Sequence, residues 1–315
     1  VRRLRLGSYD NVLPGARYHN SKDFMDFPNL GARSLENRPL HPLKSPLIEA
    51  QRNVFAAIAE GDILLNYPYH SFRYTEQLLS SAAIDPGVRS IQVTLYRIAR
   101  ESNIANSLIC AALNGKDVLA IVELRARFDE AANIDWAKRL TEAGVHVIFG
   151  VPGLKVHAKL MLIGRQEGSQ LRRYAHICTG NFNEKTARIY TDLALFTANP
   201  GICEDVHNVF DFIRHTWRRH KFHHLAVSPL SNRSALLRLI HAEVLNARAG
   251  RSAGIFIKCN NLVDEGIIER LYDASQAGVK IRVIVRGMCA LVAGVKGVSE
   301  NIETISIVDR FLEHS

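Results

Sequence analysis

A histidine and a lysine stand two residues apart where an apolar run begins, at His157 and Lys159, just ahead of Leu160–Ile163. In an extended chain, residues two apart project from the same face, so we expect the imidazole and the ammonium group to be neighbours on one face of a strand. A neutral imidazole can attack phosphorus, and a lysine beside it can hold phosphoryl oxygens. The pair is therefore a candidate for chemistry on a phosphorylated anion.

Basic residues gather around this pair along the sequence, as a binding path for a long anion would require. The net charge is +9 and the pI is near 9.4, which favours an anionic partner: nucleic acid, acidic lipid or a phosphorylated substrate. Composition does not choose among these three. The basic residues nearest the pair are Lys155, Arg172, Arg173, Lys185 and Arg188.

The 315 residues, 47% of them hydrophobic, are enough for a large core and for more than one domain. No apolar run approaches the roughly 20 residues that span a bilayer, and no signal-peptide segment follows the basic start. The five cysteines show no CxxC spacing, which favours a cytoplasmic location, with membrane association left open. Because the first residue is Val1, we expect a piece of a longer protein.

The elements that must position the pair alternate between strands and helices. Strand candidates cover residues 91–96, 118–124, 145–149 and 156–163. Helical patterns over 104–114 and 129–143 each end at a glycine, Gly115 and Gly144, as is common just past a helix C-terminus. This order predicts an α/β fold with a mostly parallel sheet flanked by helices.

The second part of the chain repeats this pattern. Residues 104–122 match residues 267–285 at a constant offset of 163, and a strand candidate precedes each segment. Any helix–glycine–strand unit resembles another to some extent, but the preceding strands favour an internal duplication. A strand is also expected over 305–308. By this correspondence His314 takes the place of His157, and we expect the second copy to be truncated.

A His-x-Lys motif in two duplicated α/β halves, followed by the turn Thr179–Asn183, resembles the phospholipase D superfamily. Enzymes of that superfamily carry an aspartate seven residues after the histidine, and here that position is Gly164. The resemblance leaves open a phosphodiesterase acting on lipid or nucleic acid. The basic charge alone would also fit a nucleic-acid binder without enzymatic activity.

Longer stretches are more specific. They are "YPYHSF" (67–72), "TLYR" (94–97), "VELRARFDEAANIDWAKRLTEAGVHVIFGVPGLKVHAKL" (122–160), "RRYAHICTGNFNEKTARIYTD" (172–192), "VRGMC" (285–289) and "SIVDRFLEH" (306–314). These stretches resemble bacterial polyphosphate kinase of the first type. The resemblance implies the end of an upstream helical head domain and a connector over 1–46. It also implies phospholipase D-like catalytic domains over 47–222 and, incomplete, over 223–315.

The resemblance implies reversible transfer of the γ-phosphate of ATP to the end of a polyphosphate chain through a phosphohistidine, with Mg²⁺ as cofactor. ATP, ADP and inorganic polyphosphate would be the partners, nucleic acid would not, and a homo-oligomer is expected. His157 matches the histidine that becomes phosphorylated, and His314 would act as the second catalytic histidine on the bridging oxygen.

The remaining roles follow from the same resemblance. Arg97 and Arg127 match a magnesium–phosphate site, and as cations they would bind phosphate oxygens that also bind the metal. The residues that would contact ATP are Tyr190, Arg286 and His314. Support for phosphate binding is expected from Lys159, Asn181, Asn183 and Arg188. His176 is an alternative catalytic histidine, although a supporting role is the simpler interpretation.

Overall fold

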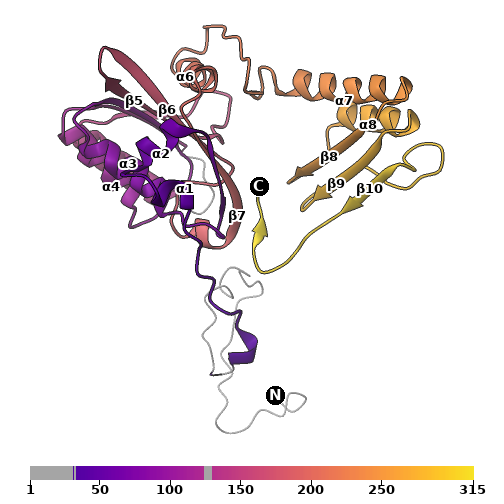
Figure 1. Ribbon diagram of the computed structural model, residues 1–315, viewed down its shortest axis with the longest axis horizontal. Coiled ribbons are helices and arrows are strands. Elements are labelled where there is room, and N and C mark those ends of the chain that lie inside the picture. The colour runs from indigo at the N-terminus through magenta and orange to yellow at the C-terminus, as the bar shows by residue number, and fades with distance from the viewer. Residues whose placement is uncertain (1–30, 32, 124–129) are drawn as a thin grey trace. The chain divides into compact units, whose positions relative to one another are not determined.

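The computed structural model describes residues 31, 33–123 and 130–315 (Figure 1). The chain divides into two compact units, residues 1–39 and residues 40–315. Within the first unit, the structure describes a 3-10 helix, η3 (Arg33–Leu35). The second unit contains both sheets and all the residues that the sequence placed in a candidate site. One of them, Arg127, lies outside the described residues.

A large sheet forms the centre of the first half of this unit. Its order is β1-β7-β6-β5-β2-β3-β4, and β11 lies beside β7. The bounds are β1 (Ile63–Tyr67), β2 (Val88–Leu95), β3 (Asp117–Val122), β4 (His146–Phe149), β5 (Lys159–Glu167), β6 (Gln170–Cys178), β7 (Tyr190–Thr197) and β11 (Leu312–Glu313). The predicted strands are therefore present, with bounds shifted by up to four residues.

This sheet is mixed, so the expected α/β fold is confirmed but the expectation of mostly parallel strands was wrong for part of it. Strands β2, β3 and β4 pair in parallel, whereas β1, β7, β6, β5 and β2 pair antiparallel in that order. The reason lies in the connections. A tight turn at Gly168 joins β5 to β6, and strands joined by a hairpin run antiparallel, whereas the parallel strands are joined by helices.

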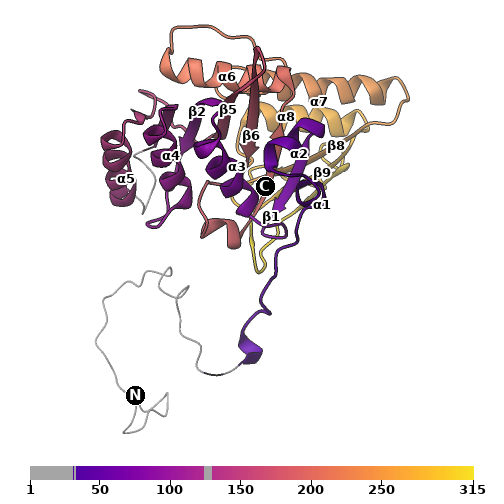
Figure 2. The ribbon, with the colours of Figure 1, turned by 60° about the vertical axis from the view of Figure 1, so that its left-hand side comes forward.

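Helices cover both faces of the large sheet (Figures 1 and 2). Apolar residues of α3 and α4 pack with Met161 and Ile163 of β5, while α6 packs with Leu160 and Leu162. The alternation expected for β5 is thus confirmed. The helices of this half are α1 (Pro46–Glu49), α2 (Val54–Glu60), α3 (Arg73–Ile84), α4 (Asn103–Leu113), α5 (Glu130–Glu142) and α6 (Pro200–Arg214), with the 3-10 helix η4 (Thr186–Arg188) before β7.

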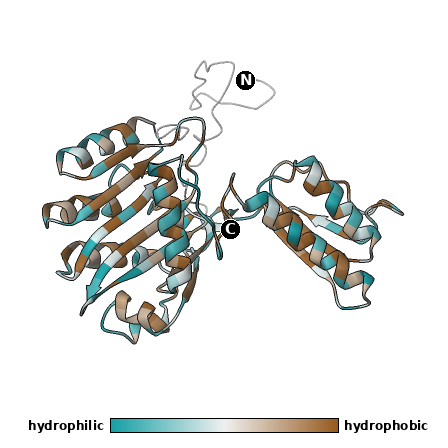
Figure 3. Cartoon of the chain, turned by 90° about the horizontal axis from the view of Figure 1, so that it is seen from above, coloured by the Kyte–Doolittle hydropathy of each residue, from teal (hydrophilic) through white to brown (hydrophobic). Residues whose placement is uncertain are grey.

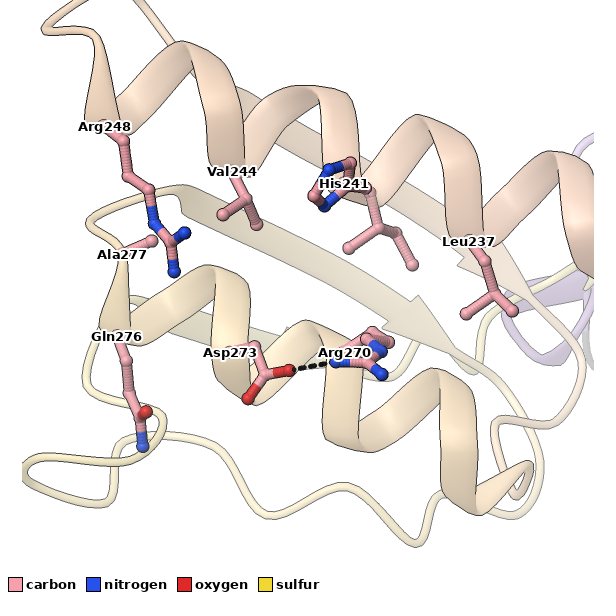
Figure 4. Close-up of a pocket in the computed structure, with 9 residues that line it drawn as sticks. Leu237, His241, Val244, Arg248, Arg270, Asp273, Gln276 and Ala277 are labelled. Carbon is pink, nitrogen blue, oxygen red and sulfur yellow. Dashed lines mark hydrogen bonds and ion pairs between the residues drawn. The ribbon is translucent and has the colours of Figure 1, made fainter.

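A smaller parallel sheet follows, in the order β10-β9-β8. Its elements are α7 (Asn232–Arg248), β8 (Gly254–Cys259), α8 (Glu265–Gln276), β9 (Lys280–Val285) and β10 (Ile302–Ile305). Apolar residues run along the strands of both sheets (Figure 3). Helices α7 and α8 lie side by side, and a cavity of about 820 Å³ between them is lined by residues that include His241, Arg248 and Arg270 (Figure 4).

The internal duplication is visible in the elements themselves. Shifting β3 by 163 residues gives 280–285, the bounds of β9, and shifting α4 gives 266–276, which lies within α8. The order β4-β3-β2 also recurs as β10-β9-β8, parallel in both cases. The constant offset of 163 residues no longer holds at β10. This strand covers Ile302–Ile305 rather than the expected 305–308. Among the described residues, no helix is both long and apolar enough to cross a membrane.

Candidate active site

The side chains of His157 and Lys159 are in contact. Strand β5 begins at Lys159, so His157 lies just before the strand rather than within it, which corrects the expected strand start. The Nζ atom of Lys159 nevertheless lies 3.0 Å from Nδ1 of His157 and also donates to the carbonyl oxygen of His157. The side chains are neighbours because the lysine reaches back along the chain.

One aromatic ring organises the groups around this pair. The ring of Tyr96, just past the end of β2, meets the imidazole of His157 edge-on, with 4.7 Å between ring centroids. Three cations also lie close to the Tyr96 ring: Lys159 at 5.1 Å, Lys155 at 5.4 Å and Arg97 at 5.8 Å from its centroid. An aromatic face attracts cations and so eases their mutual repulsion. The result is an imidazole bordered by positive charge.

This setting determines the protonation of the pair. Although His157 is exposed as a residue, the groups packed around its ring remove part of its hydration and lower its pKa to about 4, and the charges of Lys159, His314, Lys155 and Arg97 act in the same direction. Burial also lowers the pKa of Lys159, which is only 4% exposed, to about 8, although Asp192 opposes that shift. At neutral pH the imidazole is thus uncharged, while most Lys159 side chains keep their proton.

His314 reaches the same region from the far end of the chain. Strand β11 pairs in parallel with β7, with Leu312 opposite Tyr190, and this brings His314 to the carboxylate of Asp192. Nδ1 of His314 lies 2.7 Å from Oδ1 of Asp192. Because a carboxylate accepts, Nδ1 carries the proton, and Nε2 is the nitrogen left for a ligand.

The predicted Gly-Asn turn packs against this carboxylate. Thr179 donates from Oγ1 to Oδ1 of Asp192 at 2.7 Å. A Cβ atom at Gly180 would lie 2.2 Å from Oδ2 of Asp192, so this position has no room for a side chain. Asp192 is itself only 2% exposed. The turn and the carboxylate therefore form one packed unit under His314.

The two predicted asparagines of the turn differ in their surroundings. Asn181 is buried, and its Oδ1 atom has no hydrogen-bond partner among the described residues. Asn183 is also buried, but its Oδ1 accepts from the main-chain N–H groups of Lys185 and Thr186 at 3.0 and 3.1 Å. Asn183 thus shapes the turn, and any phosphate contact from it would have to come from its amide nitrogen.

The other predicted residues lie on several different elements. Tyr190 opens β7 with its ring 5.2 Å from that of His314. Arg188 is exposed in η4, and Arg286 is half-buried directly after β9. Arg127 lies outside the described residues, so its predicted contact is not placed. The structure thus groups a set of predicted residues through contacts and charge interactions that also involve Tyr96 and Asp192: His157, Lys159, Arg97, Tyr190 and His314.

Comparison with known proteins places this site in a family. The family model described as polyphosphate kinase C-terminal domain 1 matches residues 53–219, and the one described as C-terminal domain 2 matches residues 225–315. The chain belongs to the polyphosphate kinase family. The first of these matches alone covers more than half of the chain, and it contains the whole His157 segment.

Individual polyphosphate kinases are similar along nearly the whole chain. The chain is 59% identical to a polyphosphate kinase of Vibrio parahaemolyticus over 312 residues, 99% of this chain and 45% of that protein. It is 54% identical to the Escherichia coli polyphosphate kinase over 314 residues, 99% of this chain and 46% of that protein. The crystal structure of polyphosphate kinase from Porphyromonas gingivalis matches with a TM-score of 0.84 and 39% identity, over 96% of this chain and 50% of that one. The chain thus spans about half the length of these relatives.

In this structure the packing around residue 164 is tight enough to favour a glycine. This glycine lies in β5 opposite Ser90 of β2, and a Cβ atom there would lie 2.6 Å from Oγ of Ser90. A side chain at this position would require the Ser90 hydroxyl to move. The absence of the aspartate that a phospholipase D enzyme carries here counts against the phosphodiesterase alternative.

His176 has the surroundings of a core residue. It is 0% exposed, its Nε2 atom lies 3.0 Å from Oγ1 of Thr75, and the rings of Phe182 and Phe196 pack against it. Burial lowers its pKa to about 3. An imidazole enclosed in this way has no open path to a large anion, which supports the simpler interpretation of this histidine.

Sequence reasoning gave no role to Tyr96, Asp192, Thr94 or Glu123, all of which bear on the site. Two of them carried a signal that could have been used. Asp192 stands two residues after Tyr190, and Tyr96 stands directly before Arg97, in stretches that already contained predicted site residues. Thr94 and Glu123 stand in such stretches too, but each lies at the end of an apolar strand, and the sequence does not show that its side chain contacts main-chain atoms of the His157 segment.

Proposed function

We propose that this chain carries the catalytic centre of an ATP–polyphosphate phosphotransferase that works through a phosphohistidine at His157. One observation carries the proposal: an exposed, uncharged imidazole is in contact with Lys159 and surrounded by further cations. A neutral imidazole is a nucleophile, and the cations suit the charge on a transferring phosphoryl group. The family supports the same substrates, since the relatives named above are polyphosphate kinases.

The contact between Lys159 and His157 defines the first step. A protonated lysine can only donate, so in the free site the lone pair of Nδ1 is engaged and the ring proton is on Nε2. Incoming phosphoryl oxygens attract the ammonium group and release the imidazole. A ring nitrogen with its lone pair free then attacks the γ-phosphorus, the P–N bond forms, and the bond from phosphorus to the bridging oxygen of ADP breaks.

The second step returns the phosphoryl group to an oxygen. A terminal oxygen of polyphosphate attacks the phosphohistidine, the P–N bond breaks, and the chain grows by one phosphate. The same steps in reverse make ATP from ADP. With a proton on each ring nitrogen, His314 would donate from Nε2 to the bridging oxygen as charge develops there, while its Nδ1–H stays on Asp192.

In this proposal Mg²⁺ binds together with ATP, through the phosphate oxygens of the nucleotide. The described residues contain no group of three or more His, Cys, Asp and Glu side chains able to hold a metal ion. The groups nearest His157 include Arg97, Lys155 and Lys159, and cations do not bind Mg²⁺, which prefers oxygen ligands. These residues therefore suit the phosphate oxygens of a magnesium nucleotide, where the bound ion would neutralise part of the phosphate charge.

We expect formation of the phosphoenzyme to fall as the pH rises through about 8. The charge on Lys159 is present below its pKa of about 8 and lost above it, whereas His157, with a pKa of about 4, stays uncharged through the neutral range. Quenched-flow labelling of the full chain with γ-labelled ATP, from mildly acidic to alkaline pH, measures this. In Lys159→Arg the guanidinium stays charged, so the loss should move to higher pH. An alkaline loss at the same pH in both proteins would contradict the assignment.

Replacing Arg97 should weaken phosphoryl transfer more than it weakens folding. Arg97 is half-buried beside the Tyr96 ring and within electrostatic reach of His157. Losing one charge-assisted contact in the transition state costs on the order of 2–4 kcal/mol. Steady-state kinetics of Arg97→Ala, with the exposed Arg100→Ala as the control, measures the effect. A wild-type rate with an ordinary magnesium response in Arg97→Ala would refute it.

A further inference from the structure

The segment that carries His157 has no strand partners of its own. Residues 155–158 lie between the turn after β4 and the start of β5, and they belong to no helix or strand. Such a segment can shift unless something other than a sheet holds it. Two buried side chains, Glu123 and Thr94, bind its main chain on either side of the histidine.

Glu123 holds the residue before the histidine. It follows β3 directly, is 5% exposed, and its Oε2 atom accepts from the main-chain N–H of Val156 at 3.0 Å. Its own backbone is fixed, because its N–H donates to the carbonyl of Leu95 at 2.9 Å and its carbonyl accepts from Nδ2 of Asn133 at 2.9 Å. A carboxylate is costly to bury, so its place beneath this loop needs a compensating contact. The Val156 amide supplies one.

Thr94 holds the residues after the histidine. It is 1% exposed, and its Oγ1 atom donates to the carbonyl of Ala158 at 2.7 Å while accepting from the N–H of Leu160 at 2.9 Å. The main-chain pairing of β2 with β5 ends at Val93 and Met161. The Thr94 hydroxyl therefore continues the hydrogen bonding between β2 and the chain of β5 beyond the last main-chain pair.

Thr94 also links two parts of the site. It stands two residues before Tyr96, whose ring packs on the imidazole, and three before Arg97. A shift of residues 157–160 relative to β2 would therefore separate the histidine from the aromatic ring and from the cations around it. The Thr94 hydroxyl therefore fixes the position of His157 relative to Tyr96 and Arg97.

We propose that Thr94 and Glu123 are positioning residues that fix the main chain on either side of His157, so that its imidazole meets the γ-phosphorus in line. This inference rests on the proposed function, since it assumes that His157 accepts the phosphoryl group. Both side chains are buried and bind main-chain atoms, so the proposed role is to position His157 rather than to contact the substrate. Displacing a reacting group by about 1 Å can cost on the order of 10²-fold in rate, so two main-chain contacts can matter as much as a direct one.

The test compares variants that differ in a single hydrogen-bonding group. Thr94→Val keeps the shape of the side chain but removes both hydrogen bonds, and Thr94→Ser keeps the hydroxyl. We expect Thr94→Val to lower the rate of phosphohistidine formation by about tenfold to a hundredfold, with the KM for ATP nearly unchanged. Thr94→Ser should restore most of that rate. Quenched-flow labelling with γ-labelled ATP, normalised to folded protein, gives the rate.

A matched control separates position from stability. Thr197 is also a fully buried threonine with hydrogen bonds through its hydroxyl, but it lies at the opposite end of β7 from Tyr190. Thr197→Val should lower the Tm without lowering the labelling rate of the folded protein. A Thr94→Val protein that labels at the wild-type rate, or a loss of equal size in Thr197→Val, would overturn the proposal.

Glu123 provides a second test should Thr94→Val not fold. Glu123→Gln keeps an oxygen that accepts from Val156, whereas Glu123→Met removes it, and only Glu123→Met should label slowly. Equal rates in the two variants would overturn the role of Glu123. Failure of the proposed function looks different: the wild-type protein itself would then carry no label at His157, whatever the variants do.

Discussion

We expect His157→Ala to abolish the labelling by γ-labelled ATP that the proposed phosphohistidine predicts for the wild-type protein, and with it the synthesis of polyphosphate. The physical reason is that an imidazole is the side chain best suited to act both as nucleophile and as leaving group near neutral pH, and here its low pKa keeps it uncharged. The label on the wild-type protein should be labile to acid, survive alkali and be discharged by ADP. Gel analysis after acid and alkali treatment, together with peptide mapping, measures this.

The fold should survive this change because the histidine contributes little to the core. His157 is exposed and precedes β5, while Leu160 and Met161, which follow it, carry the packing on the two faces of the sheet. His176→Ala is the informative comparison, because it removes a fully buried ring and should lower the Tm strongly. Label that persists in His157→Ala but vanishes from folded His176→Ala would show that the wrong histidine was chosen. Binding of polyphosphate without any label in the wild type would favour a protein that only binds anions.

The sequence predicts that His157 and Lys159 lie close together, but not the contact that brings them together. Period-two alternation placed both on one face, and it did place Met161 and Leu162 correctly on opposite faces of the sheet. It could not show that β5 begins only at Lys159, because the start of a strand depends on where its partner ends. Here the partner is β6, whose last residue, Cys178, pairs with Lys159, while the ladder with β2 already stops at Val93 and Met161.

Contacts between distant segments were beyond the reach of local pattern. The repeat at 163 residues predicted the helix and strand α8 and β9, because each copy buries its own apolar face. If the second copy followed the first throughout, the segment that carries His314 would pair with β8, just as β5 pairs with β2. The structure pairs that segment, β11, with β7 instead, while Lys258 of β8 contacts Glu313 through its side chain. The role of Asp192 follows from this pairing across more than a hundred residues, and no periodicity encodes it.

We expect Asp192→Asn to slow the proposed phosphoryl transfer and to lower its alkaline limit, the pH above which labelling falls. Two contacts give the reason. The carboxylate holds Nδ1 of His314 at 2.7 Å, and the loss of a well-oriented general acid costs on the order of 10²-fold or more. The same carboxylate favours the charged form of Lys159, so its removal lowers the lysine pKa below about 8, and the charge is lost at lower pH. Labelling rates measured against pH report both effects.

The asparagine is a fair test because it nearly matches the aspartate in size, and Gly180 leaves no spare room beside this residue. His314→Ala should share the slower transfer but not the shift of the alkaline limit, since Asp192 would remain beside Lys159. Asp205→Asn is the control for burial: Asp205 is also 2% exposed, but it accepts from the main-chain N–H groups of residues 223–225. Asp205→Asn should lower the Tm but leave unchanged the pH above which labelling falls. An Asp192→Asn protein with the wild-type rate and limit would mean that the His314–Asp192 contact plays no part in transfer.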